Sequence, residues 1–367
     1  MLLAGCGGAP ESSEASATSD DWMTLEGETQ GTTFRFVWNA AGAQEVKPEQ
    51  LDSILTEVDD AVNLWNPQSD LVRINAWPLD SGAYTWRDSS QILTLLWLRS
   101  EEIWSASDGA FDPTVGPLVA LWGFGLTKAA EVTPAGLQAA RAAVGFTRDV
   151  VSLEEIEGPD GALLSQVKKE VPGVLLDFNA IAQGYTVDLV ADFLRERGVQ
   201  HGMVEIGGEV RCWGKNDRSE DWHIAIDAPI AETGNDRVFD AIALVQDAAI
   251  CTSGSYRKFR EVAGKRLSHA IDPRTGNPVD HGLLSATIRA HTAATADALA
   301  TACLVMGPED GKVFIDGYRQ EHPEERIDAY FLIDNGAGGW TSWMTEGWKG
   351  NLIPTDSKQP TGSGEPI

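Results

Sequence analysis

The sequence predicts an α+β fold organised as one large globular unit. Segments with a helical period of apolar residues are interleaved with short runs rich in β-branched and aromatic residues, and the second half is the richer in such runs. This distribution favours α+β over a doubly wound α/β fold, in which strands and helices alternate throughout. Apolar material for a core is ample, since 43% of the residues are hydrophobic and 13 are Trp. By length alone, two domains would also fit.

Up to Gly198 the sequence predicts one strand and three long helices. Residues 32–38 alternate in polarity, as a strand does. Apolar residues recur at helical spacing over 48–64 and again over 89–106. A third helix is predicted over 186–197, and Gly198 follows it as a C-cap would.

Beyond Gly198 the sequence predicts mainly strands. They are expected over residues 202–206, 222–226, 241–245, 285–290 and 329–333. Between the last two lies a helix-forming run, residues 296–301. Asp297 and Thr301 are four residues apart and would share one face of that helix. A carboxylate and a hydroxyl are the oxygen ligands that suit Mg²⁺ and phosphate-bearing substrates. The alternative is an ordinary core helix.

The charge distribution sets one segment apart from the rest of the chain. The formal net charge is −27, from 28 basic and 55 acidic residues, so the surface repels anions and no nucleic-acid partner is expected. Residues 257–274 nevertheless hold six Lys or Arg against only Glu261 and Asp272, beside His269. An anionic ligand would be concentrated there. The alternative is a solvated basic hairpin.

The two ends are expected to lie outside the globular unit. Leu3-Ala4-Gly5-Cys6 is similar to a bacterial lipobox, in which Cys6 would carry lipid, although the preceding residues are too few for a full signal peptide. The polar, acidic residues after it predict a disordered tether, so we assign 1–27 to lipobox and tether. We assign 28–351 to the globular domain and 352–367 to a disordered tail. No run approaches the roughly 18 apolar residues of a membrane span, which favours anchoring over spanning.

The other three cysteines do not indicate a disulfide framework or a zinc site. Cys212, Cys251 and Cys303 are odd in number, widely spaced and set among apolar or small residues. We therefore expect buried free thiols.

Several glycine-rich turns are candidates for ligand contact. Residues 108–117 and 121–125 combine glycines with Phe111 and Trp122, whose rings could stack on a flat ligand, although such aromatics more often belong to a core. Residues 176–185 predict a strand that enters a helix through small residues, a junction that can offer N–H and carbonyl groups to a phosphate or a metal. The chain has no GxGxxG, P-loop, GxSxG or HExxH motif, which argues against the functions these motifs serve.

Taken in order, these segments resemble one enzyme family. QGTTF (30–34), NPQSDLVRIN (66–75), DGAFDPTVGPLVALWGFG (108–125), LDFNAIAQGYTVD (176–188), EIGGEV (205–210), TSGSYRKF (252–259), SHAIDPRTGNPV (268–279) and ADALATA (296–302) are similar to motifs of the FAD:protein FMN transferases, and the similarity covers about 28 to 348. The resemblance implies a T-fold-like α+β architecture. It also implies Mg²⁺-dependent cleavage of the FAD diphosphate, release of AMP, and attachment of FMN by a phosphoester to a Ser or Thr of a membrane redox protein.

The resemblance also implies roles for individual residues. Asp297, Thr301 and the backbone carbonyl of Ala180 match the metal ligands, and His269 matches the position that would activate the acceptor hydroxyl. The positions that match FAD-binding residues are Gln30, Trp65, Ala110, Phe111, Asp112, Asp177, Gln183 and Ala270. Gln30 stands where the family usually has Met, Trp65 where it has Tyr, and Gln183 where Lys or Glu is common. Alternatively, Asp112 and Asp177 would stabilise turns or cap helices, and His269 would have a structural role.

Two other functions remain open from the sequence. With water as the nucleophile, the chain would be an FAD pyrophosphatase that releases FMN and AMP. A non-catalytic flavin-binding lipoprotein is the more distant alternative, and the Asp297–Thr301 pair argues against it because simple flavin binding needs no metal. For any of these, we expect a protein anchored by lipid to a bacterial membrane, preferably the inner one, and facing the periplasm. Its partners would be FAD and the acceptor subunits of membrane redox complexes.

Overall fold

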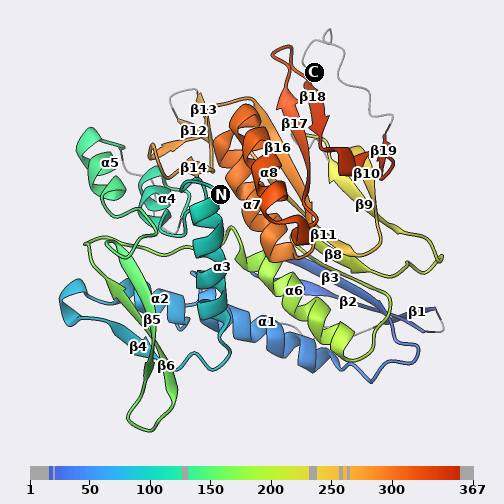
Figure 1. Ribbon diagram of the computed structural model, residues 1–367, viewed down its shortest axis with the longest axis horizontal. Coiled ribbons are helices and arrows are strands. Elements are labelled where there is room, and N and C mark those ends of the chain that lie inside the picture. Colours follow the sequence, from blue (N-terminus) through green and yellow to red (C-terminus); the bar gives the residue numbers. More distant parts are fainter. Residues whose placement is uncertain are drawn as a thin grey trace.

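The fold is built around one nine-stranded antiparallel sheet (Figure 1). The computed structural model describes residues 16–19, 21–125, 131–230, 238–255, 259–262 and 265–355, with backbone alone at 16–19, 259–262 and 265–266. In sheet order the strands are β1 (Ser16–Ser19), β2 (Trp22–Thr29), β3 (Thr32–Asn39), β7 (Gly202–Ile206), β8 (Glu209–Trp213), β11 (Ala248–Gly254), β16 (Leu283–Ala290), β17 (Asp328–Asp334) and β18 (Trp340–Met344).

Helices cover one face of this sheet (Figure 1). They are α1 (Pro48–Val62), α6 (Ala182–Glu196), α7 (Ala293–Met306) and α8 (Pro308–Glu321). The main hydrophobic core lies between these helices and the sheet, where Phe36 and Ile288 of the sheet meet Val190 of α6 and Leu299 of α7. Helix α7 is buried over almost its whole circumference, because it has neighbours on several sides and its residues are mostly Ala, Leu and Val.

A small sheet covers part of the opposite face. It contains β9 (Trp222–Asp227), β10 (Phe239–Val245) and β19 (Leu352–Pro354), in the order β19-β10-β9. A second core forms between the two sheets, with Trp22, Trp222 and Trp348 among its buried side chains. These large apolar side chains explain how two stacked sheets remain together without a helix between them.

The remaining elements form a lobe beside the main sheet and two hairpins above α7 (Figure 1). The lobe holds α2 (Asp70–Ala76), α3 (Ile92–Ala106), α4 (Gly116–Trp122), α5 (Pro134–Arg141) and the sheet of β4 (Tyr84–Trp86), β6 (Leu163–Lys169) and β5 (Val151–Glu157). The hairpins pair β12 (Phe259–Val262) with β13 (Lys265–Ser268), and β14 (Ile271–Asp272) with β15 (Asn277–Pro278). Three short 3-10 turns complete the structure, η1 (Leu79–Ser81), η2 (Pro323–Glu325) and η3 (Glu346–Trp348).

Most of the predicted elements are confirmed, and the fold class is α+β as expected. The predicted helices are present, and so are the strands predicted at 32–38 and beyond Gly198, with ends that differ by a few residues. The strand predicted at the start of residues 176–185 is absent, because residues 174–178 form no regular secondary structure and α6 follows directly after a turn. Gly198 has φ 87°, the left-handed conformation of a C-cap glycine. Helix α6 begins at Ala182, before the predicted start at Thr186, and α7 (Ala293–Met306) extends beyond the predicted 296–301 at both ends.

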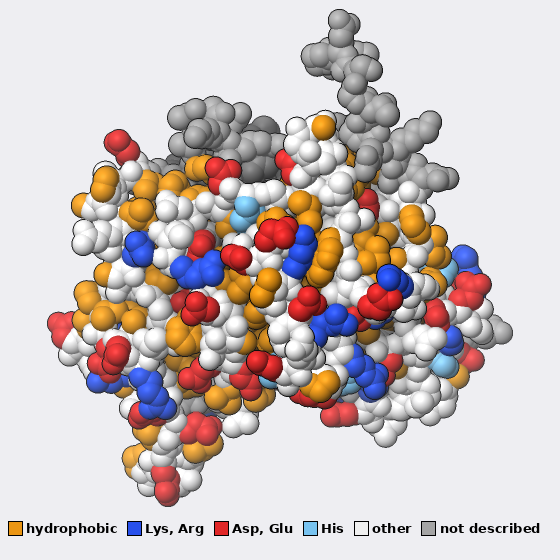
Figure 2. Space-filling view, turned by 45° about the horizontal axis from the view of Figure 1, so that its top comes forward, with side chains coloured by type: hydrophobic (Ala, Val, Ile, Leu, Met, Phe, Trp, Pro, Cys, Tyr) orange, Lys and Arg blue, Asp and Glu red, His pale blue; other side chains and the backbone are white. Residues whose placement is uncertain are grey.

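The predicted domain limits need small corrections. Strand β2 begins at Trp22, inside the predicted tether 1–27, and β19 lies inside the predicted tail 352–367. Cys6 lies outside the described residues. Cys212, Cys251 and Cys303 are buried free thiols, as expected. Among the described helices, none combines the length and the apolar character that crossing a bilayer requires. Acidic and basic side chains are interspersed on the face shown in Figure 2.

Candidate active site

The candidate site is centred on the contact between the N-terminal turn of α6 and helix α7. Gly184, in the first turn of α6, permits this contact, because a Cβ at that position would lie only 2.3 Å from the carbonyl oxygen of Ala293 and 2.9 Å from the Cβ of Asp297. The two backbones therefore approach more closely than any larger residue would allow. This approach brings Asp297 against the segment that the sequence identified as a ligand-binding junction.

Gly184→Ala is expected to lower the free energy of unfolding by about 3 kcal/mol, because the added methyl group overpacks the contact between two backbones. The control is Gly317→Ala in α8, where an added Cβ meets nothing within 4 Å. That change should stabilise by about 0.5–1 kcal/mol, because alanine is the better helix former. Chemical denaturation followed by circular dichroism measures both. Equal small effects would show that the close contact of α6 and α7 does not form.

Asp297 is held in place by the backbone of α6. Its Oδ2 accepts a hydrogen bond from the N–H of Gly184 at 3.2 Å, so Asp297 caps one of the N–H groups that have no partner within the helix. The side chain is buried, and this burial raises the pKa of Asp297 to about 7, against the lowering effect of the Gly184 hydrogen bond. No described residue donates a hydrogen bond to Oδ1, so this oxygen remains available to a ligand.

Of the other two predicted metal ligands, Thr301 lies on α7 and Ala180 lies two residues before the start of α6. The N–H of Gly184 is one of the first N–H groups of α6, which have no acceptor within the helix, and it bonds to Asp297. Among the described residues, no donor reaches the Ala180 carbonyl. One turn beyond Asp297 on α7, the hydroxyl of Thr301 lies 3.0 Å from that of Ser253 on β11.

These donors fit Mg²⁺, which binds oxygen ligands. The set consists of a carboxylate oxygen of Asp297 and the hydroxyl of Thr301, both on α7, and the carbonyl of Ala180, which lies in the turn before α6. Within the described chain, no cluster of three or more His, Cys, Asp or Glu forms a metal site. The predicted set contains one carboxylate, so its remaining coordination positions suit water or the phosphates of a substrate.

Two of the predicted flavin-binding residues, Gln30 and Gln183, also meet at the start of α6. Gln30 lies in the turn between β2 and β3, with φ 50°, and its Nε2 donates to the Thr186 hydroxyl at 2.7 Å. Gln183 lies beside the turn between β7 and β8, where a Cβ at Gly207 would be 3.1 Å from its Nε2. These turns therefore place two side-chain amides next to the predicted metal ligands.

Asp112 and Asp177 are close to each other but act chiefly as turn residues. The backbone N–H of Asp177 bonds to the Pro113 carbonyl at 2.7 Å, which joins the two glycine-rich segments. Asp112 Oδ1 accepts from the N–H and hydroxyl of Thr114, and its Oδ2 accepts from Trp104. Asp177 accepts from the N–H of Asn179. Burial raises the pKa of both carboxyl groups, opposed by these hydrogen bonds.

The predicted aromatic contacts differ in accessibility. Phe111 is 2% exposed and packs in the main core, which is the alternative that the sequence left open for this ring. Ala110 is equally buried, and any ligand contact at these two residues would go through backbone atoms. Trp122 donates from its ring N–H to the Gly276 carbonyl at 2.8 Å. Trp65, in contrast, is 62% exposed in the segment between α1 and α2, where its ring is accessible to a flat ligand.

His269 and Ala270 lie in the short connection between β13 and β14. The Ala270 N–H bonds to the Ser268 hydroxyl, and its carbonyl accepts from Val279, which fixes the backbone beside His269. Strand β14 contacts α7, so this connection lies over the helix that carries Asp297. Of the six basic residues in 257–274, Arg274 is the one whose side chain is described, and it forms a two-point ion pair with Asp272. The proposed role of the others lies outside the described side chains.

Asp188 is a buried charged residue at this junction that sequence reasoning did not single out. It accepts hydrogen bonds from the N–H groups of Ala293 and Ala294 at 2.9 and 2.8 Å, and from Arg211 at 2.9 Å. Burial raises its pKa to about 6, against the lowering effects of Arg211 and the two N–H groups. A signal was present, since Asp188 closes the motif of residues 176–188, but its partners Ala293 and Ala294 are about a hundred residues away in the chain.

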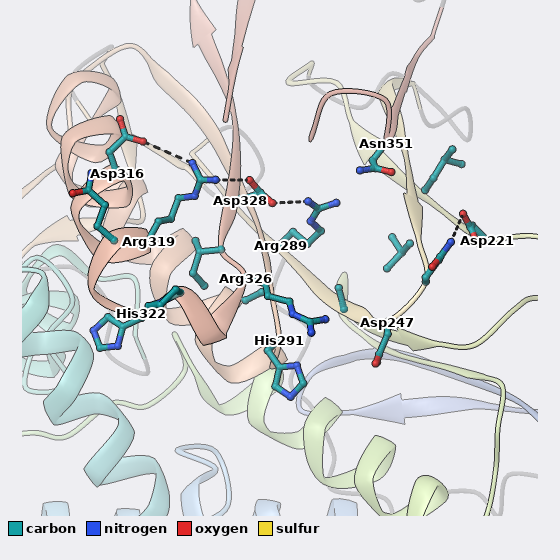
Figure 3. A pocket seen from close by; sticks show the side chains of 18 residues that line it. Asp221, Asp247, Arg289, His291, Asp316, Arg319, His322, Arg326, Asp328 and Asn351 are labelled. Atoms are coloured by element: carbon teal, nitrogen blue, oxygen red, sulfur yellow. Dashed lines mark hydrogen bonds and ion pairs between the residues drawn. The ribbon is translucent and has the colours of Figure 1, made fainter. Parts of the chain in front are cut away.

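A cavity of about 680 Å³ lies elsewhere on the molecule (Figure 3). None of the predicted site residues lines it. Figure 3 shows Asp328 between Arg289 and Arg319, and both arginines bond to its carboxylate. The lining carries acidic and basic side chains in nearly equal number, so it does not concentrate anions. The chemistry at the α6–α7 contact therefore defines the candidate site.

The sequence profile of the ApbE family matches residues 30–326. The chain belongs to the ApbE family. A FAD:protein FMN transferase from Vibrio cholerae is 36% identical over 316 residues, which cover 85% of this chain and 86% of that protein. A second FAD:protein FMN transferase, from Salmonella typhimurium, is 32% identical over 365 residues, covering 96% and 95%.

Solved structures of ApbE proteins have the same fold. The flavin transferase ApbE from Vibrio cholerae superposes with a TM-score of 0.73 at 32% identity, covering 92% of this chain and all of that chain. The apo form of Pseudomonas stutzeri flavinyl transferase ApbE gives 0.73 at 30% identity, covering 92% and 97%. The family membership that the motifs predicted is thus confirmed, and the α+β fold matches that of ApbE flavin transferases.

Proposed function

We propose that this chain is a Mg²⁺-dependent FAD:protein FMN transferase. Its substrate would be FAD, and its acceptor a Ser or Thr hydroxyl in a subunit of a membrane redox complex. The observation that carries the proposal is the hydrogen bond from the Gly184 N–H to Asp297, which fixes this carboxylate at the start of α6, where no described donor reaches the carbonyl of Ala180. The transferase names of relatives at 31–36% identity support the same reaction class.

The proposed reaction is a phosphoryl transfer between two oxygens. The acceptor hydroxyl oxygen would form a bond to the phosphorus of the FMN half, and the bond from that phosphorus to the bridging oxygen would break, so that AMP leaves. The hydroxyl proton would pass to His269, since histidine can accept a proton near neutral pH. Mg²⁺ held by Asp297, Thr301 and Ala180 would neutralise the negative charge that develops on the phosphate oxygens.

The other site residues would orient FAD rather than take part in bond making. The exposed ring of Trp65 offers an apolar face for stacking, and the backbone at Ala110 and Phe111 lies in the turn that abuts Asp177. Gln30 and Gln183 offer amide groups at the start of α6. The peptide at Ala270, held by Ser268 and Val279, would contribute backbone contacts.

Mass spectrometry after incubation with FAD, Mg²⁺ and a candidate acceptor tests this function. We expect the acceptor to gain one FMN less one water, with equimolar AMP, through a bond that survives denaturation. An acceptor with its target Ser or Thr changed to Ala is the matched control and should gain nothing. Free FMN and AMP with no modified acceptor would instead establish a FAD pyrophosphatase. Absence of AMP under all conditions would favour a non-catalytic flavin-binding lipoprotein.

We also propose a location for the protein, based on the LAGC segment and the acidic residues after it. A lipid on Cys6 would hold the enzyme at a bacterial membrane, preferably the inner one, facing the periplasm beside its acceptors. In a bacterial host that processes lipoproteins, Cys6→Ala should abolish incorporation of labelled fatty acid and move the protein out of the membrane fraction. Unchanged fractionation of that variant would reject the anchor.

A further inference from the structure

Two carboxylates tie α6 and α7 together, and each reaches across to the first turn of the other helix. Asp297 of α7 accepts from Gly184 of α6, while Asp188 of α6 accepts from Ala293 and Ala294 of α7. Gly184 and Asp188 are four residues apart and share one face of α6, and Ala293 and Asp297 do the same on α7. The two links therefore lie about one turn apart and together fix both the rotation and the axial position of α7.

Both carboxylate oxygens of Asp188 take part in hydrogen bonds at this link. Its Oδ1 accepts from Ala293 and Arg211, and its Oδ2 accepts from Ala294, so both oxygens are already in use. Arg211 of β8 has a side chain only 6% exposed, and it balances the buried charge of Asp188 while also reaching Asp192. A carboxylate occupied in this way is not a metal ligand. Its contribution is to the position of α7.

The position of α7 determines the geometry of the predicted metal site, because the ligands come from two separate segments of the chain. Asp297 and Thr301 move with α7, whereas Ala180 lies in the turn that leads into α6, two residues before it begins. If α7 turned or slid, both of its ligands would shift together relative to the carbonyl. Such a shift should lower the affinity for Mg²⁺ more than the affinity for Ca²⁺. Mg²⁺ demands near-ideal octahedral geometry with ligand oxygens at about 2.0–2.1 Å, whereas Ca²⁺ accepts flexible geometry with ligand oxygens at about 2.3–2.6 Å.

We propose that Asp188 is a positioning residue that, together with Arg211, sets the spacing of the cation site and thereby its preference for Mg²⁺ over Ca²⁺. This inference rests on the proposed Mg²⁺-dependent function. It assigns to Asp188 no contact with FAD, with the metal or with the acceptor. The mechanism is the one by which outer partners orient metal ligands in other proteins, here through a helix N-terminus instead of through a ligand side chain.

The test is calorimetric titration of the full chain with Mg²⁺ alone and with Ca²⁺ alone, in the wild type and in Asp188→Asn. We expect Asp188→Asn to lower Mg²⁺ affinity by about 10- to 100-fold, as loss of an outer partner typically does, and Ca²⁺ affinity by less. The matched control is Asp192→Asn, which removes the same charge and the other partner of Arg211 but has no described bond to α7. Its ratio of Mg²⁺ to Ca²⁺ affinity should equal that of the wild type.

The outcomes separate positioning from other roles. An equal fall for both cations would assign the effect of Asp188 to charge alone and overturn the proposal, as would unchanged Mg²⁺ affinity. Circular dichroism establishes that the titrated variant is folded. If Asp188→Asn does not fold, Asp188→Glu keeps the charge but lengthens the reach, and it should lower the same ratio. A wild-type chain that binds neither cation would reject the proposed metal site itself, which is a different failure.

Discussion

Replacement of Asp297 by alanine is expected to lower the rate of FMN transfer by at least about 10³-fold, because a catalytic metal contributes several kcal/mol of charge stabilisation. Asp297 supplies the one carboxylate among the three predicted ligands, so its loss removes the main attraction for Mg²⁺. Single-turnover transfer, measured as a function of Mg²⁺ concentration, gives the effect. Near-wild-type turnover of the variant at limiting Mg²⁺ would reject the metal assignment.

Two further variants separate the loss of the metal from the loss of structure. Asp297→Asn keeps an oxygen that can accept the Gly184 N–H, so it should preserve the α6–α7 contact while still lacking the charge. We expect it to be almost as inactive as the alanine variant. Thr301→Val should weaken Mg²⁺ binding less than either, because a hydroxyl is a neutral ligand. Unfolding curves for all three show whether any loss of activity follows from loss of the fold.

Local patterns predicted the helix that carries Asp297 and Thr301 well. The spacing of Asp297 and Thr301 indicated one helix face, and the structure places both at the surface of α7 that meets α6 and β11. The helical and strand periods were equally informative, since α1, α3 and β7 are set by residues close together in the chain. Such features depend on interactions within one or two turns, which a single sequence displays directly.

What the sequence did not predict depends on contacts between distant residues. Helix α6 begins at Ala182 because Asp297, more than a hundred residues later, caps its first turn. The role of Asp188 depends in the same way on the N-terminus of α7. Phe111 shows a second limit of the local sequence. The glycines around it left ligand stacking and core packing both open, and the structure places the ring in the core. Periodicity carries no information on such pairings, so neither helix cap could be derived from it.

His269→Ala is expected to reduce transfer by about 10²–10⁴-fold, the usual contribution of a general base. FAD affinity should change little, because in the proposed mechanism the imidazole acts on the acceptor hydroxyl and does not hold FAD. The wild-type rate should also fall as the pH drops through the range of about 5–8 in which histidine gains its charge, since a protonated ring cannot accept a proton. That acid limb should be absent in the variant.

Single-turnover transfer as a function of pH, with FAD binding followed by flavin fluorescence, distinguishes the possible roles of His269. The Ala270 peptide is hydrogen-bonded on both sides, so the backbone of this connection has support that does not come from the His269 ring. An unchanged rate at saturating FAD would therefore identify His269 as structural and direct attention to Asp272, the carboxylate on β14. Because Asp272 is paired with Arg274, it would have to leave that ion pair to accept a proton. Lost FAD binding with an unchanged chemical step would instead place His269 among the FAD-binding residues.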